Sequence, residues 1–341
     1  MPEPYILSNI TVCLLLATAF GVVSAVRKSD LWLEASRELW RRRPIALLVF
    51  GLYLLIGLLD SIAWVGGSVT GEDAVAVYKP KSIVDRLFVN LEEKSYSAPL
   101  ADREFYDRSP LRHQGSHLLG TDILGRDVLY LTLKGARVAL LIGILTSLIA
   151  IPLAVLLGVA AGYFGKRTDD IIFFLLSTLA SMPGLLLLIA LIIVLGRGTL
   201  SVCIALGVTS WVGFCRITRG ETMKLRELDY VYAARVLGVS ETRIIARHVL
   251  PGLVHLIVIT FVLTFSGLVL TEAVLSWLGV GVDGSWGQMI AQAKDEISRE
   301  PVIWWNITSA GVALFVLLLV LNFVGDAIRD ILDPRTLREN L

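Results

Sequence analysis

The sequence predicts an all-α polytopic membrane protein, and two observations carry that prediction. Hydrophobic residues make up 55% of the 341 positions and charged residues only 18%, which excludes a soluble globular protein. The charges also gather in loops between about seven apolar runs of the kind that cross roughly 30 Å of hydrocarbon. Because hydrocarbon cannot satisfy backbone polar groups, such runs fold as helices.

Residues 1–43 are expected to form an extra N-terminal transmembrane helix and a basic cytoplasmic loop. The apolar run 6–26 is preceded by one charged residue, Glu3, and followed by Arg27-Lys28. A cleaved signal peptide has the opposite order, with basic residues first. This order, together with the cluster Arg41-Arg42-Arg43, favours an uncleaved helix with its N-terminus outside.

The rest of the chain is expected to divide into four parts. They are a transmembrane helix over 44–66, an external region over 67–133, a membrane core over 134–334 and a cytoplasmic tail over 335–341. The fold of the external region cannot be read from its sequence. Four of its charged residues either line a substrate entrance or, on the simpler interpretation, are solvated surface groups: Asp85, Glu92, Glu93 and Lys94.

The core is predicted to contain five more spans. They are expected at 138–163, 171–195, 200–214, 252–282 and 306–324. Pro183-Gly184 predicts a bend in the second of these, and Asp169-Asp170 is expected to cap its start. The segment 283–302 is expected to be an outer loop.

A charged stretch, residues 229–251, interrupts the apolar runs and is predicted to form two short helices. Asp229 is expected to be the N-cap of a helix over 230–237, and Gly238 to end it in the left-handed conformation. Ser240 is expected to cap a second helix, and Pro251 suits the first turn of the span that follows. A short helix of this kind, facing solvent between two spans, predicts a docking element.

The same stretch resembles the cytoplasmic coupling loop of ABC importer permeases. Ala233-Ala234, then Gly238, then Leu250-Pro251 follow the pattern of that loop. Tyr232 and His248 depart from it, since Glu and Ile are usual at those two positions. Neither departure alters the expected succession of helix, glycine and helix.

A second motif, before the third span, is similar to the signature that opens the membrane core of dipeptide and oligopeptide permeases. The matching residues are Leu119-Gly120-Thr121-Asp122, Gly125-Arg126-Asp127, Gly135-Ala136-Arg137 and, further on, Leu275 to Gly279. Thr121-Asp122 is also expected to cap a helix start. From about residue 118 to residue 334, the chain therefore resembles the dipeptide, oligopeptide and nickel permease family, as its second, C-type half.

This resemblance implies a type I importer core of six helices and a cytoplasmic coupling helix that contacts separate ATPase subunits. The coupling residues it implies are Asp229, Tyr232, Ala233, Ala234, Arg235, Gly238, Leu250 and Pro251. The implied partners are a second homologous permease, one or two ABC ATPases that use ATP and Mg, a periplasmic or lipid-anchored substrate-binding protein and the lipid bilayer, but no nucleic acid. The implied location is the bacterial inner membrane, with the C-terminus in the cytoplasm.

The implied substrates are di- or oligopeptides, with nickel, an antimicrobial peptide or another small solute as alternatives. Glu272 lies within a predicted span, where a carboxylate is costly. It is expected either to contact the translocation path or to make an interhelical hydrogen bond. No phosphate-binding G-x-x-x-x-G-K-[ST] motif and no metal-ligand spacing occur, so catalysis, metal binding and a cofactor are not expected. A stand-alone secondary transporter is a weaker alternative.

Overall fold

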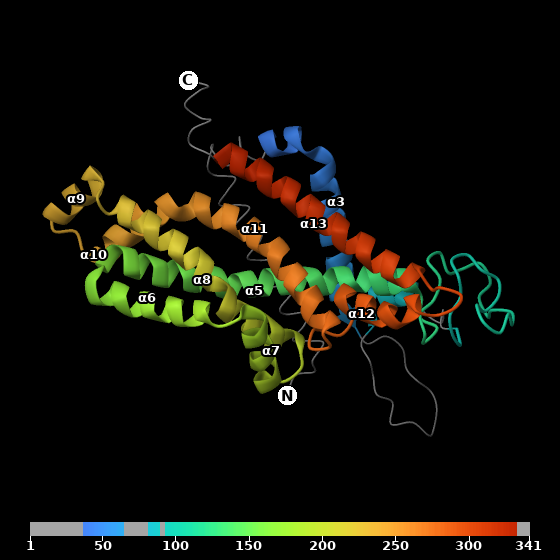
Figure 1. Ribbon diagram of the computed structural model, residues 1–341. Helices are drawn as coiled ribbons and strands as arrows, with labels where there is room; N and C mark the ends of the chain where they lie inside the picture. Colours follow the sequence, from blue (N-terminus) through green and yellow to red (C-terminus); the bar gives the residue numbers. More distant parts are fainter. Residues whose placement is uncertain (1–36, 65–80, 89–92, 333–341) are drawn as a thin grey trace. The chain divides into compact units, whose positions relative to one another are not determined.

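The computed structural model describes residues 37–64, 81–88 and 93–332 (Figure 1). Nearly all regular structure in these ranges is helical, apart from one pair of two-residue strands. The predicted first span over 6–26, Glu92 and the tail over 335–341 lie outside the described residues.

The described helices confirm an all-α polytopic membrane fold. Within the described ranges, five helical segments are long and apolar enough to cross a membrane, and a bent pair of helices counts as a sixth. The five are α3 (Pro44–Ser61), α5 (Val128–Phe164), α8 (Thr199–Leu225), the segment Glu241–Trp277 that ends with α11 (Leu250–Trp277), and α13 (Trp305–Leu332). The bent pair is α6 (Lys166–Ser181) and α7 (Gly184–Leu195).

Helix α5 begins well before the predicted start at 138, because Asp127 provides its cap. The Oδ1 atom of Asp127 accepts hydrogen bonds from the amides of Leu129 at 2.8 Å and Tyr130 at 3.1 Å. The prediction that Thr121-Asp122 caps a helix is wrong. Both residues lie in the loop before α5, where Asp122 instead accepts the amide of Arg126 at 2.8 Å.

The predicted bend at Pro183-Gly184 is a full break of 93° between α6 and α7. Proline cannot donate to the preceding turn, and here its backbone is extended, so the helix stops and restarts. The predicted cap at Asp169-Asp170 is also wrong. The N-cap of α6 is Gly165, and Asp169 lies in the first turn, where it pairs with Arg219.

The last membrane elements differ from the predicted ones in their ends. Helix α11 stops at Trp277 instead of continuing to 282, because Gly279 turns the chain in the left-handed region with φ +81°. The expected outer loop over 283–302 contains a helix, α12 (Trp286–Ile297), whose cap Ser285 accepts the amide of Gln288 at 3.2 Å.

The described chain forms two compact units. The first contains residues up to 140 together with 276–279 and 283–327. Two buried tryptophans, Trp286 and Trp305, stabilise it, and the Nε1 atom of Trp305 donates to the carbonyl of Thr121 at 2.9 Å. The Nε1 atom of Trp286 donates to the carbonyl of Thr132 at 2.8 Å, and its ring lies so close to Gly135 that an added Cβ would be 2.3 Å away.

In the same unit, a small structure of two strands and a short helix precedes α5. Strand β1 (Ala63–Trp64) pairs antiparallel with β2 (Lys81–Ser82), and α4 (Ile83–Leu87) follows with a capping box between Ser82 and Asp85. Asp85 also forms an ion pair with Lys134 of α5 at 2.6 Å. Glu93 is buried, so its interpretation as a solvated surface charge is wrong, whereas Lys94 is exposed.

The second unit contains residues 141–275, 280–282 and 328 onward. Helices α5 and α8 pack closely there through glycines on α5. A Cβ added at Gly158 would lie 2.8 Å from the carbonyl oxygen of Cys215, and one at Gly162 would lie 2.6 Å from that of Arg219. Absence of a side chain at both positions therefore lets the two backbones approach.

Candidate functional site

The stretch that is predicted to dock forms two short helices in the second unit, α9 (Asp229–Val236) and α10 (Glu241–Ile244) (Figure 1). The N-cap of α9 is Leu228, so the prediction of Asp229 as the cap is wrong by one residue. The Leu228 carbonyl accepts the amides of Val231 at 2.9 Å and Tyr232 at 3.0 Å. Asp229 lies in the first turn, where a carboxylate is favourable to the helix dipole.

Gly238 ends α9 in the left-handed conformation, as predicted, with φ +77°. Its amide donates to the carbonyl of Arg235 at 3.0 Å, and the amide of Val239 donates to that of Ala234 at 3.1 Å. These two bonds satisfy carbonyls that the end of the helix would leave free. No atom outside the chain neighbours lies within 4 Å of an added Cβ at Gly238, so its backbone angle is what requires glycine.

The second short helix is continuous with α11, in a segment that is long and apolar enough to cross a membrane. Ser240 holds the N-cap position of α10, but its side chain makes no capping hydrogen bond, so that part of the prediction is wrong. A wide π-helical turn, η1 (Ile245–Val249), joins α10 to α11. Pro251 lies in the first turn of α11, immediately after the wide turn, and Leu250 packs against the core below α9.

Helix α9 has a buried face and an exposed apolar face. Val231 and Ala234 are buried in a cluster that includes residues of α5 and α11. On the outside, Tyr232 is 63% exposed, Val236 is 70% exposed and Leu237 is 82% exposed. Ala233 and Arg235 are exposed as well. The core therefore holds α9 in place while large apolar side chains point away from it.

Glu272 is buried in α11, with 3% of its surface exposed. Its Oε1 atom accepts the amide of Val282 at 3.4 Å, which ties α11 to the turn that follows it. This hydrogen bond is a structural role of the kind expected for a carboxylate inside a span. Contact with the translocation path stays a prediction.

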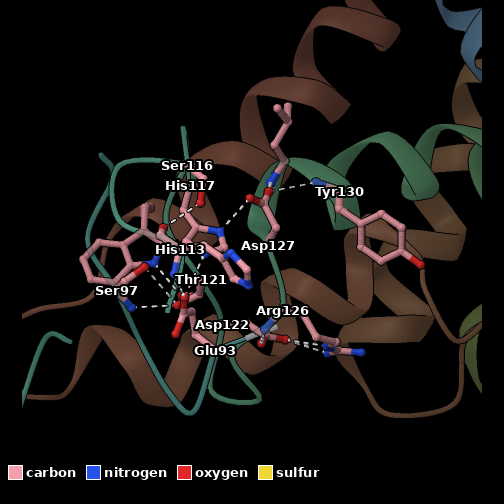
Figure 2. Close-up of polar contacts among 12 residues, drawn as sticks. Glu93, Ser97, His113, Ser116, His117, Thr121, Asp122, Arg126, Asp127 and Tyr130 are labelled. Atoms are coloured by element: carbon pink, nitrogen blue, oxygen red, sulfur yellow. Dashed lines mark hydrogen bonds and ion pairs between the residues drawn. The ribbon is translucent and has the colours of Figure 1, made fainter. Parts of the chain in front are cut away.

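A buried histidine between two carboxylates, which the sequence reasoning missed, lies before α5 in the first unit (Figure 2). His117 has no exposed surface. Its Nδ1 atom lies 2.9 Å from Oδ2 of Asp127, and its Nε2 atom lies 3.6 Å from Oε1 of Glu93. The hydrogen bond with Asp127 raises the pKa of His117, burial opposes this, and the charge of Glu93 adds to the rise.

The two carboxylates are fixed by backbone amides. Glu93 accepts the amides of Arg112 at 3.1 Å and His113 at 2.8 Å, while Asp127 caps α5 (Figure 2). The cluster therefore joins the start of α5 to two loop segments. Asp127 was visible within the G-R-D motif, and His117 stands directly before L-L-G-T-D, but Glu93 lies too far away in sequence to be linked to them.

Another buried carboxylate of this unit is Glu296 in α12. It accepts hydrogen bonds from the Tyr96 hydroxyl at 3.1 Å and from Nδ2 of Asn306 at 3.1 Å. Burial raises the pKa of Glu296, and the bonds from Asn306 and Tyr96 act against this rise. Throughout the described ranges, no three His, Cys, Asp or Glu side chains are placed to hold a metal ion.

Solved structures with similar folds include inward-facing conformations of the MetNI methionine ABC transporter. One of them is 21% identical, covers 60% of this chain and 97% of that chain, and has a TM-score of 0.49.

Curated relatives are more similar to this chain in sequence than that solved structure is. The oligopeptide transport system permease protein OppC of Haemophilus influenzae is 35% identical over 225 residues, which cover 65% of this chain and 71% of that protein. OppC of Bacillus subtilis is 33% identical, with 70% of this chain and 80% of that protein covered. The di/tripeptide transport system permease protein DppC of Pseudomonas aeruginosa is 36% identical, with 65% and 73% covered.

The family model for the binding-protein-dependent transport system inner membrane component matches residues 154–338, more than half of the chain. That range includes α6 to α13, and therefore both the short helices α9 and α10 and Glu272. The chain belongs to this family of inner membrane components, the multi-pass permease subunits of ABC importers.

Proposed function

We propose that this chain is a permease subunit that forms half of the translocation pathway of an ATP-driven importer of di- or oligopeptides. One observation carries the coupling part of the proposal. In a chain of this family, the short helix α9 and its C-cap expose Tyr232, Val236 and Leu237, while the other face of the helix is buried. Exposed apolar surface of this kind marks an interaction site.

The proposed partner of α9 is a separate ATPase subunit. Because buried Val231 and Ala234 already hold α9 in the core, a partner would bind a pre-formed helix and would not have to order it. The chain has no phosphate-binding loop of its own, so ATP and Mg would be bound by the partner subunits. We assign no catalytic step to this chain.

The relatives support peptides as the substrate class. The similar proteins reported above are permeases of transport systems for oligopeptides and for di- and tripeptides. Nickel, an antimicrobial peptide or another small solute is the alternative. A second homologous permease and a periplasmic or lipid-anchored binding protein would complete the importer. The proposed orientation places the N-terminus outside and α9 and the C-terminus in the cytoplasm, in line with the basic loops.

The first test is purification of the tagged full chain from its native host in mild detergent, followed by mass spectrometry. We expect a second permease and one or two ATPases with P-loops. Uptake by the reconstituted complex is then compared for labelled dipeptide, tripeptide, longer peptide and nickel. Recovery of the chain alone, monodisperse and in good yield, would refute the coupling role, and uptake of nickel but no peptide would refute the substrate.

A matched pair of variants tests the docking surface itself. Leu237→Glu places a charge at the exposed C-cap of α9, and Leu124→Glu places one on another exposed residue, in a loop of the first unit. Since neither side chain is buried, both variants should fold. We expect Leu237→Glu to weaken ATPase binding by about 30-fold, as loss of an interface hot spot does, and Leu124→Glu to leave it unchanged. Equal recovery of the ATPase with both variants would argue against docking through α9.

A further inference from the structure

Three side chains meet at the point where α9 joins the long membrane helices. They are Tyr163 near the end of α5, Arg235 in the last turn of α9, and Glu241 at the start of α10. We refer to these three residues as the three-way joint. All three lie in the second unit of the structure.

The contacts of the joint form a closed set. The hydroxyl of Tyr163 donates to Oε2 of Glu241. The Nε atom of Arg235 lies 3.7 Å from Oε1 of Glu241, and its guanidinium carbon lies 5.5 Å from the centre of the Tyr163 ring. Each residue therefore touches both of the others.

The two polar links differ in strength. Arg235 and Glu241 are 42% and 48% exposed, so their ion pair is screened by solvent and contributes little. Tyr163 is buried, and its hydroxyl bonds to a carboxylate, which is the stronger, charge-assisted kind of hydrogen bond. The link between Tyr163 and Glu241 is therefore the main polar connection between α5 and α10.

The joint connects α9 to two membrane helices at once. Glu241 is the first residue of the segment Glu241–Trp277, which is helical throughout, including its wide turn. Only the turn at Gly238 separates it from α9, and the Arg235–Glu241 pair bridges that turn. Beneath the polar contacts, fully buried Val231 and Ile244 pack in one cluster with Tyr163.

We propose that Tyr163, Glu241 and Arg235 are positioning residues that transmit displacement of α9 to α5 and to α11. This inference rests on the proposed function, because it assumes that α9 docks onto an ATPase. A displacement of α9 carries Arg235 with it and changes the geometry at Glu241, which bears on both membrane helices. The joint transmits that movement because its contacts have different free energies in the two states of the transporter.

The test uses the complete complex purified with the tagged chain and reconstituted into proteoliposomes. ATP hydrolysis and ATP-driven uptake of a radiolabelled tripeptide are both measured, which gives the number of peptides taken up per ATP. Tyr163→Phe removes only the hydroxyl, and Glu241→Gln removes only the charge. The control is Tyr53→Phe, which removes a hydroxyl that donates to the carbonyl of Ala313 in the first unit.

We expect Tyr163→Phe to retain ATP hydrolysis and to lower the peptide-to-ATP ratio about tenfold, the shift in equilibrium that follows loss of one hydrogen bond to a charged group. Glu241→Gln should act in the same direction. The double variant should be little worse than Tyr163→Phe, because both changes act on the Tyr163–Glu241 contact and the exposed Arg235–Glu241 pair contributes little. Tyr53→Phe should keep the wild-type ratio.

A purely structural role would lower uptake and hydrolysis together, in proportion to the amount of assembled complex, and would leave their ratio unchanged. An unchanged ratio in Tyr163→Phe and Glu241→Gln would therefore overturn the proposal while the proposed function stood. A wild-type complex without ATP-driven peptide uptake would overturn the proposed function, and the role of the joint would fall with it.

Discussion

Replacement of Gly158 by alanine should destabilise the fold by about 1–3 kcal/mol, the usual cost of forcing an extra methyl group into a filled space. The added Cβ would lie 2.8 Å from the carbonyl oxygen of Cys215 and 2.8 Å from Cβ of Thr218. The carbonyl belongs to the backbone of α8 and cannot rotate away. One turn further along α5, Gly162 faces α8 at equally short range, so a sliding motion of α5 would not relieve the clash.

The measurement is the melting temperature of the purified chain in mild detergent, with unfolding monitored by tryptophan fluorescence. The expected loss corresponds to a fall of about 2–4 °C for each kcal/mol. The control is Gly220→Ala on α8, where nothing lies within 4 Å of the added Cβ. Because alanine is favoured over glycine in a helix by about 1 kcal/mol, the control should melt no lower than the wild type. If Gly158→Ala melted as high as Gly220→Ala, the close approach of α5 and α8 would be refuted.

Three further predictions concern titration of the first unit, each read from melting temperatures across a pH series. Because the pKa of His117 is raised, the contribution of this histidine to stability is complete below the ordinary histidine pKa of 6.5 and is lost as the pH rises through the raised pKa. His117→Gln should therefore reduce the fall in melting temperature at alkaline pH. Burial alone would raise the pKa of Asp85, but hydrogen bonds from Lys134, Tyr130 and the Ser82 amide lower it to about 2. Its contribution is therefore present above 3.8 and lost as the pH falls towards 2, and Asp85→Asn should melt lower than wild type at pH 7 but lack this acid decline. Burial raises the pKa of Glu296, so stability falls as the pH rises from 4.5 through the raised value. At pH 7, the free energy of unfolding of Glu296→Gln should therefore lie within about 1 kcal/mol of the wild-type value, and the two proteins should melt at similar temperatures.

The sequence predicts features that depend on the local chain. Gly238 is an example, because its left-handed conformation follows from the end of one short helix and needs no distant partner. The cap of α9 was misplaced by one residue because both Leu228 and Asp229 precede an apolar helical face, and the choice of first helical residue depends on how that face docks. Within the described residues, the positions of the spans were likewise readable from hydropathy, but their ends were not.

Features that depend on tertiary contacts could not be read in this way. Glu93 and His117 are brought together by the fold of the segment before α5, whose sequence has no clear periodicity. Burial of Glu93 contradicts the expectation that this residue is a solvated surface charge. At Pro183, the sequence indicated an interrupted helix but gave no angle, since the direction of α7 is set by packing against α8.

The elbow between α6 and α7 also restricts what can surround it. A helix of 12 residues such as α7 rises about 18 Å, which is too short to cross a bilayer alone. At the elbow, Met182 and Pro183 are extended, so carbonyls at the end of α6 and amides at the start of α7 lie beyond the reach of the helical ladder. Acyl chains offer these groups neither donors nor acceptors. At membrane depth, the break between α6 and α7 must therefore be hydrated or covered by protein, so lipid is excluded from it.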